Sequence, residues 1–144
     1  MLVTLLSILA VAAALTLWLI AVYNGLIRLR NMKEEAWSGI DVQLKRRSDL
    51  IPNLLESVKG YMGHERSVLE QVTSLRAQSM NAATVGAKIA AESALSRSLG
   101  ALFAVAENYP DLKASQNFLD LQNQLAQIET EVQMARRYYN GTVR

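Results

Sequence analysis

A group of polar side chains between residues 45 and 53 could form a binding or catalytic site. The group consists of Lys45, Arg46, Arg47, Asp49 and Asn53, set in an otherwise apolar pattern. Arginine and lysine bind anionic groups, and an aspartate can accept or donate a proton. These five residues are therefore the candidate site, and a partner-binding role for its exposed members is one interpretation of it.

A turn between two helices is the other interpretation of this segment. Ser48 and Asp49 carry oxygens that can cap a helix N-terminus, and Pro52 is tolerated in a first helical turn. Charged side chains also suit helix ends, which leave backbone groups unpaired. This interpretation predicts a first helix ending near Arg47, a second beginning near Leu50, and an exposed corner between them, far from the N-terminal segment.

The pair His64-Glu65 could suggest a metal-dependent hydrolase. The zinc motif HExxH needs a second histidine four residues after the first, and that position is Val68. The chain has one histidine and no cysteine, so a transition-metal site has few ligands available. We therefore expect no metal and no cofactor, and a hydrolase using Asp49, His64 and Glu65 is the less favoured alternative.

The composition favours helices and argues against nucleic-acid binding. Half of the 144 residues are hydrophobic, whereas the chain has only seven glycines and two prolines. A net charge of +2 without a basic arm gives no reason to expect nucleic acid as a partner. Arg136 and Arg137, followed by Tyr138 and Tyr139, could bind an anionic partner or close a helical seam.

The N-terminal segment predicts a membrane anchor. The 21 residues from Leu2 to Val22 contain no charged side chain, and as a helix they would be about 30 Å long, the thickness of a hydrocarbon core. A cleaved signal peptide is the rival, because Ala10–Ala12 resembles a cleavage site. No basic residue precedes the apolar run, and the run continues well past that site, so an uncleaved anchor in the lipid bilayer is preferred.

The distribution of basic residues predicts the orientation of this anchor. None precedes the apolar run, whereas Arg28, Arg30 and Lys33 follow it closely. Basic residues flanking a span stay in the cytoplasm. The N-terminus is therefore expected outside, with residues 24–144 in the cytoplasm.

The remaining chain predicts an all-α fold, in which the N-terminal transmembrane helix continues into an antiparallel four-helix bundle. Apolar residues recur three and four apart, and no segment alternates like a strand. Expected breaks are the segments Asn81–Gly86 and Asn108–Asp111, while Gly60–Gly63 would be a kink or a close helix contact. Trp37 is predicted to be buried against the second helix. The last helix, from about Phe118, has a regular seam that could also support self-association.

The chain resembles the LemA family of bacterial membrane proteins. The resemblance rests on "YNGLIRLRN", "EAWSGIDVQLKRRSDLIPNLLESVKGY", "LFAVAENYPDLKASQNFLDLQNQL" and "IETEVQMARRYYN", in this order, and covers Tyr23 to Arg144. Magnetosome proteins of the MamQ type are a related branch. Family members commonly have histidine where Ser48 stands here, and they commonly continue beyond the last motif.

The resemblance implies a single-pass protein of the bacterial inner or plasma membrane, with a helical bundle and no established catalytic activity. We expect two parts, an anchor at residues 1–23 and a LemA-like bundle at residues 24–144. The favoured hypothesis is a non-enzymatic scaffold or adaptor that presents the bundle to an unidentified membrane or cytoplasmic protein. A component of an envelope-stress or signalling system is the alternative, and the sequence does not separate the two.

Overall fold

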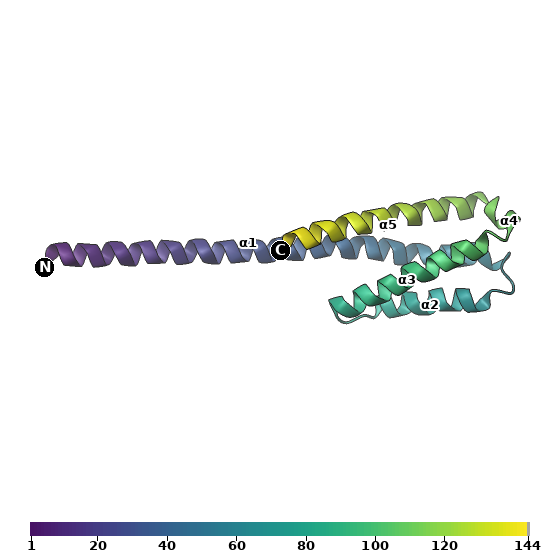
Figure 1. Cartoon of the computed structure of the whole chain (residues 1–144), viewed down its shortest axis with the longest axis horizontal. Coiled ribbons are helices and arrows are strands. Elements are labelled where there is room, and N and C mark those ends of the chain that lie inside the picture. Colours follow the sequence, from purple (N-terminus) through teal and green to yellow (C-terminus); the bar gives the residue numbers. More distant parts are fainter. Residues whose placement is uncertain (144) are drawn as a thin grey trace. The chain divides into compact units, whose positions relative to one another are not determined.

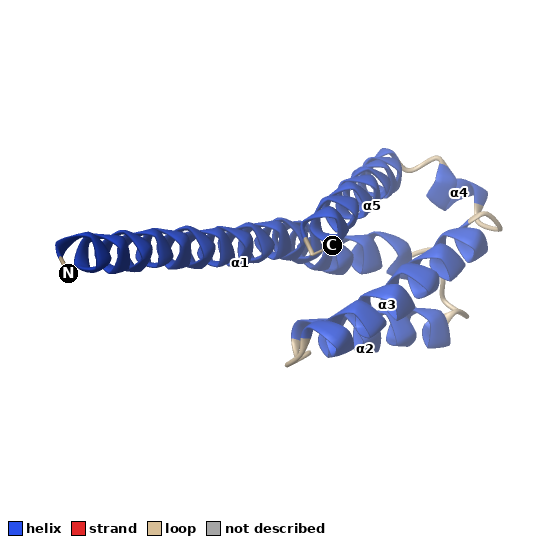
Figure 2. Cartoon of the chain, turned by 60° about the vertical axis from the view of Figure 1, so that its left-hand side comes forward, coloured by secondary structure: helices blue, strands red, loops and turns tan. Residues whose placement is uncertain are grey.

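The computed structural model describes residues 1–143, and all regular structure in this range is helical (Figure 1). Short loops join the helices, and no strand occurs among these residues (Figure 2). The all-α prediction is therefore confirmed. The helices are α1 (Leu2–Lys59), α2 (Arg66–Met80), α3 (Val85–Ala106), α4 (Pro110–Lys113) and α5 (Gln116–Thr142).

The chain divides into two compact units. Unit 1 consists of Met1–Gly39 and Ala135–Arg144, and unit 2 consists of Ile40–Met134. Arg144, the last residue of the predicted bundle range, lies outside the described residues.

The apolar stretch of unit 1 has no protein covering. Every residue from Leu2 to Val22 is exposed, including the large side chains of Leu9, Trp18 and Ile20. By length and composition, α1 could cross a membrane. α3 passes the same test, but a third of its most apolar window is buried, as expected for a core helix of a bundle.

Unit 2 is a helical bundle built from the second part of α1, from α2 and α3, and from most of α5. Each helix buries one stripe of side chains at three- and four-residue spacing, because 3.6 residues make one turn. α2 and α3 form a hairpin, and the side chain of Thr84 in their connection accepts a hydrogen bond from the Ala87 amide and caps α3. The core contains Ile51, Leu54, Val58, Met62, Val72, Leu95, Leu99, Leu102, Ala106, Leu112, Phe118, Leu121 and Leu125.

The prediction of a corner between two helices at residues 45–49 is wrong. α1 continues through this segment and through Pro52 to Lys59. The buried side chains of Ile40, Leu44, Ile51 and Leu54 lie on one face of that single helix. The capping residues misled the prediction, because the continuous burial of this face outweighs their local preference for a helix end.

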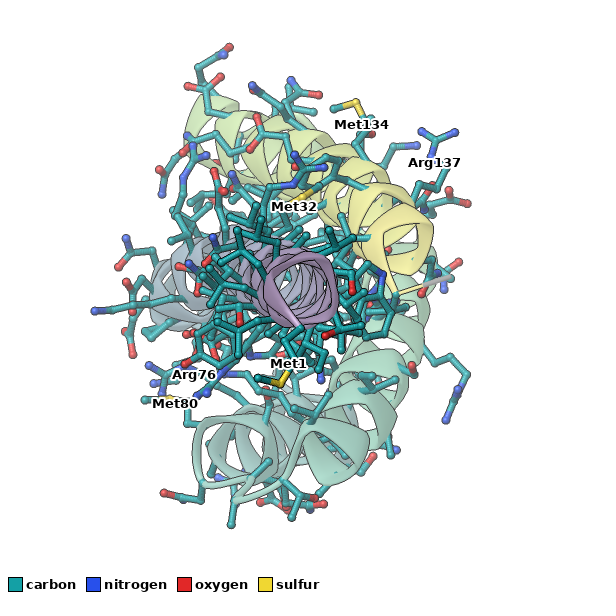
Figure 3. All side chains as sticks on the ribbon, turned by 90° about the vertical axis from the view of Figure 1, so that its left-hand side faces the viewer. Met1, Met32, Arg76, Met80, Met134 and Arg137 are labelled. Atoms are coloured by element: carbon teal, nitrogen blue, oxygen red, sulfur yellow. The ribbon has the colours of Figure 1, made fainter. Side chains whose placement is uncertain are left out.

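Pro52 is accommodated inside α1 by a side chain from α2. A proline has no amide hydrogen, so it leaves the carbonyl four residues earlier without its helical donor. That carbonyl belongs to the buried Ser48, and it accepts a hydrogen bond from Arg76 Nε at 2.7 Å. Arg76 and Met80 project from α2 in Figure 3. The proline therefore creates an acceptor at which α2 is attached to α1.

The chain reverses direction after Lys59 instead. Residues 60–65 connect α1 to α2, and this turn contains the two glycines of the segment. A Cβ atom built on Gly60 or Gly63 would meet nothing within 4 Å. The predicted interruption is therefore a loop in which the chain reverses direction. Neither glycine marks a close contact with another helix of unit 2.

Trp37 does not pack on the predicted partner. It is half-buried in unit 1, and its ring contacts Tyr139 of α5 edge to face, with 5.7 Å between the ring centroids. The prediction that Trp37 is buried against the second helix is therefore wrong. The last helix of the chain supplies its neighbour.

The turns before α2 and α4 are linked by a hydrogen bond. The Tyr109 hydroxyl donates to Glu65 Oε1 at 3.1 Å, and these residues directly precede α4 and α2. Pro110 begins α4 within the segment Asn108–Asp111, and α3 ends before this segment, as predicted. Partial desolvation, together with the hydrogen bond and the negative charge of Glu65, raises the pKa of Tyr109 above its ordinary value of 10.0.

The role of Arg76 can be tested with a double-mutant cycle. Arg76→Leu should lower the free energy of unfolding by about 1–3 kcal/mol, because the Ser48 carbonyl loses its donor. In a Pro52→Ala background, residue 52 supplies an amide to that carbonyl, so Arg76→Leu should cost less. Thermal unfolding of the four full-length variants in detergent measures both costs. If Arg76→Leu lowers the free energy of unfolding equally in the two backgrounds, the hydrogen bond from Arg76 does not compensate for the missing amide of Pro52.

The link between Tyr109 and Glu65 should stabilise the fold only while the hydroxyl is protonated. Because the folded pKa is raised, the contribution is complete below about pH 10 and is lost as the pH rises through the folded value. Tyr109→Phe should therefore have a lower melting temperature than wild type at pH 8, and the difference should shrink towards pH 11. A difference that stays constant over this range would contradict the assignment.

Candidate functional site

A buried arginine lies at the centre of unit 2. Arg47 is on the buried face of α1, between Leu44 and Ile51, and only 1% of its side chain is exposed. Its guanidinium forms an ion pair with Glu92 of α3, whose side chain is also 1% exposed. Arg47 Nη2 also donates to the Glu92 carbonyl oxygen at 3.3 Å. α1 and α3 are therefore joined by a charged pair inside the bundle.

Two further helices join this pair. The buried Ser79 hydroxyl, in the last turn of α2, donates to the Glu92 carboxylate. Glu129 of α5 accepts from Arg47 Nη1 at 2.6 Å, and Ser96 Oγ accepts from the same nitrogen at 2.7 Å. Arg47, Glu92, Glu129, Ser79 and Ser96 form what we call the arginine network. It connects the four long helices of unit 2.

The arginine network contains one cation and two carboxylates. Removing a charge from water costs several kcal/mol, so a buried pair must be compensated by close partners. Four hydrogen bonds from the Arg47 guanidinium provide this compensation. Glu129 differs from Glu92, because 37% of its side chain is exposed. Its carboxylate can therefore also form hydrogen bonds with water at the edge of the bundle.

The arginine network holds four helices together through side-chain hydrogen bonds. A serine beside a carboxylate could act as a nucleophile if a substrate reached it. Ser79 is 2% exposed and Glu92 is 1% exposed, and both lie at the bottom of a cleft of about 190 Å³ that Asp41 and Lys88 also line. The arrangement fixes the lateral and axial positions of the four helices.

The structure separates the five candidate residues into two sets. Lys45, Arg46, Asp49 and Asn53 are exposed and lie on one face of α1, as their three- and four-residue spacing requires. Arg47 lies on the opposite face and is buried. The exposed-surface prediction is therefore wrong for Arg47, because its position continues the buried stripe of α1.

We call the exposed set the α1 face. It borders a cleft of about 250 Å³ between α1 and α5, lined by Arg46, Asp49, Leu50, Gln124, Gln127 and Ile128. Arg46 crosses this boundary and donates to Glu131 Oε2 at 2.9 Å. The α1 face thus offers cations, a carboxylate and an amide beside an accessible depression.

The residues of the hydrolase alternative are not assembled. Within residues 1–143, no hydrogen bond or ion pair joins Asp49 to His64 or Glu65. Glu65 accepts from Tyr109 instead, and His64 lies exposed in the turn after α1. The same range contains no group of three histidine, aspartate or glutamate side chains that could hold a metal ion.

Comparison with known proteins assigns the family. The LemA family model matches residues 36–144, which include every residue of the arginine network and of the α1 face. The chain belongs to the LemA family. A relative called Protein LemA, from Metamycoplasma hominis, is 30% identical over 118 residues, covering 81% of this chain and 54% of the relative. The chain spans about half the length of that LemA protein.

Sequence reasoning missed the partners of Arg47 in this LemA chain. Glu92 is the only acidic residue of α3, and a carboxylate on the apolar side of a core helix requires a partner. The stripe Ile40, Leu44, Arg47, Ile51 continues at spacings of four and three through the arginine. These two signals together could have identified a buried pair. The contributions of Ser79 and Glu129 depend on tertiary packing and left no comparable signal.

Replacing Arg47 should destabilise the LemA bundle much more than replacing its neighbour. Arg47→Leu leaves Glu92 buried without its cation, which should cost about 3–5 kcal/mol of unfolding free energy. Arg46→Leu removes an exposed ion pair and should cost less than about 1 kcal/mol. Thermal unfolding of the full chain in detergent compares the two.

A second substitution distinguishes a lost ion pair from a packing defect. The double variant Arg47→Leu/Glu92→Leu contains no unpaired buried charge and should recover most of the stability lost in Arg47→Leu. If the double variant is as unstable as Arg47→Leu, the shape of the arginine matters and its charge does not.

Proposed function

We propose that this LemA-family chain is a non-enzymatic, membrane-anchored helical scaffold that presents unit 2 to a protein partner. The exposure of the whole apolar stretch Leu2–Val22 is the observation that carries this proposal. Burying such side chains from water contributes roughly 25 cal/mol per Å² of apolar surface. A lipid bilayer is the environment that covers an isolated apolar helix of this length.

The anchor is proposed to cross the bacterial inner or plasma membrane once. Basic side chains at positions 28, 30 and 33 follow the apolar stretch and none precedes it, which supports an outside N-terminus and a cytoplasmic bundle. Trp18 and Tyr23 stand near the end of the stretch, where amphipathic rings favour the membrane–water interface.

The α1 face is the proposed contact for the partner. Its four side chains, Lys45, Arg46, Asp49 and Asn53, are exposed and can meet a partner. The charged groups on the buried side of α1 are already paired with one another in the arginine network. Exposed charges set partner choice and association rate more than stability, so they can vary without unfolding the bundle. The adjoining cleft can accept a side chain of the partner.

An envelope-stress or signalling component would use the same anchor and the same face. This alternative differs in the identity of the partner and needs no further chemistry from the chain. Self-association through the α5 seam stays a prediction. Crosslinking of the full-length protein separates a second copy from a different protein by the mass of the product.

The partner-binding role of the α1 face can be tested by charge reversal. Lys45→Glu and the matched control Arg97→Glu both reverse an exposed cation on a helix of unit 2. After crosslinking in native membranes, capture of the partner should fall by about tenfold in Lys45→Glu and stay at the wild-type level in Arg97→Glu, because only the first disturbs the proposed contact.

Both variants must keep the wild-type melting temperature, since neither changed residue is buried. Unchanged capture by a folded Lys45→Glu protein would show that the α1 face does not bind the partner. An equal loss in Arg97→Glu would point to net charge instead of a defined contact.

A further inference from the structure

The two units of the chain carry opposite net charge. The described residues of unit 1 contain five basic side chains and two acidic ones, whereas unit 2 contains nine basic and eleven acidic ones. The basic residues of unit 1 are Arg28, Arg30, Lys33, Arg136 and Arg137. Three belong to α1 and two to the end of α5, so positive charge collects where these helix segments meet.

Exposed apolar side chains alternate with these cations on α1. Leu26, Ile27 and Leu29 are exposed large hydrophobic residues next to Arg28 and Arg30. Apolar stems that enter the lipid while charged groups stay in water are typical of a membrane interface. The interface is therefore expected to extend along α1 as far as Leu29, beyond the end of the uncharged stretch.

The contact between Trp37 and Tyr139 brings the end of α5 to this part of α1. Beyond Tyr139, α5 runs beside α1 towards the apolar stretch, and Figures 1 and 2 agree on this direction within unit 1. From this contact, one helical turn towards the N-terminus of α1 leads to Lys33, and one turn towards the C-terminus of α5 leads to Val143. The two residues are therefore expected at the same level. Leu29 is one more turn along α1, about 6 Å away at the usual rise per residue.

The side chains at the end of α5 suit the same environment. Tyr138 and Val143 are exposed, and an aromatic ring with a hydroxyl favours the headgroup region. Arg137 is exposed and points away from α5 in Figure 3, and Arg136 is partly exposed. No acidic side chain occurs between Ala135 and Val143, so nothing in this segment neutralises the two arginines.

We propose that the end of α5, from Arg136 to Val143, is a second membrane contact that binds anionic lipid headgroups together with Arg28 and Lys33, while Arg30 is paired with Glu34 on α1. The proposal rests on the anchor proposed above. Clustered basic residues next to a span are attracted by the negative surface of a bilayer within about one Debye length. Anionic lipid would thereby hold the end of α5 against α1.

Single cysteines can measure this contact, because the chain has no native cysteine. Three full-length variants, Gly25→Cys, Gly39→Cys and Val143→Cys, are labelled with one fluorophore and placed in lipid nanodiscs that carry a nitroxide on their headgroups. A Cβ at Gly25 or Gly39 meets nothing within 4 Å, so neither change disturbs packing. Nanodiscs of phosphatidylcholine are compared with nanodiscs that also contain phosphatidylglycerol.

The Gly25 label should be quenched in both lipids, which reports insertion of the anchor. The Val143 label should be quenched at least about twofold more in the anionic nanodiscs, because anionic headgroups attract its basic neighbours. High salt should remove this difference, and the Gly39 label should show little quenching in either lipid. Inorganic phosphate added to phosphatidylcholine nanodiscs should not reproduce the effect, since the proposed ligand is a headgroup in the bilayer.

Charge removal supplies the matched control. Arg136→Gln/Arg137→Gln in the Val143→Cys protein should abolish the gain in anionic lipid, whereas Arg97→Gln/Lys113→Gln should leave it unchanged. Equal quenching of the Val143 label in both lipids would overturn the proposal. Arg136 and Arg137 would then be expected to bind an acidic protein surface instead of lipid. A Gly25 label that is not quenched would refute the membrane anchor itself, so the two failures are distinguishable.

Discussion

The bundle of unit 2 depends on the burial of one positive charge. Only 1% of the Arg47 side chain is exposed, and Glu92, Glu129 and Ser96 accept hydrogen bonds from its Nη1 and Nη2 atoms, whereas its buried Nε has no partner among the described residues. A slip of α3 by one turn would remove Glu92 from the guanidinium and leave its carboxylate unpaired in the core, while Arg47 would keep only its pair with Glu129. The arginine network therefore penalises wrong registers that apolar stripes alone would tolerate. Apolar contacts supply most of the stability, and the charges select one arrangement of the helices.

The bond from Arg76 to the Ser48 carbonyl adds a second polar restraint one residue along α1. In the arginine network a side chain of α1 reaches its neighbours, whereas here a side chain of α2 reaches the backbone of α1. Both restraints place an arginine where a buried acceptor would otherwise lack a donor. Together they fix α2 and α3 against the same two turns of α1, directly beneath the exposed α1 face.

Most of the fold could be predicted from apolar spacing, and the errors have local causes. The stripe Ile40, Leu44, Ile51, Leu54 is visible in the sequence, yet Pro52 and the capping oxygens of Ser48 and Asp49 suggested a break within it. Local signals describe what an isolated segment prefers, whereas burial of the whole face decides what forms. The donor that permits Pro52 lies 24 residues further along the chain, so no local pattern contains it.

The candidate site was predictable in the same limited sense. The exposure of the four residues of the α1 face was predicted from residue type, and the burial of Arg47 was not, because a charged side chain ordinarily lies at the surface. Trp37 shows the reverse error. An aromatic residue among apolar neighbours suggested a core position, but its partner Tyr139 comes from the other end of the chain. Contacts of this range depend on how the helices assemble and cannot be derived from spacing.

The contact between Arg76 and the Ser48 carbonyl has a consequence for how this chain can diverge. Every amino acid has a backbone carbonyl, so the residue at position 48 can change while the acceptor remains. We expect positions 52 and 76 to change together, although their side chains need not touch, because a proline at 52 removes the amide donor that an arginine at 76 replaces. This dependence acts through the backbone carbonyl of a third residue. A comparison of sequences would therefore show no constraint on the residue type at position 48.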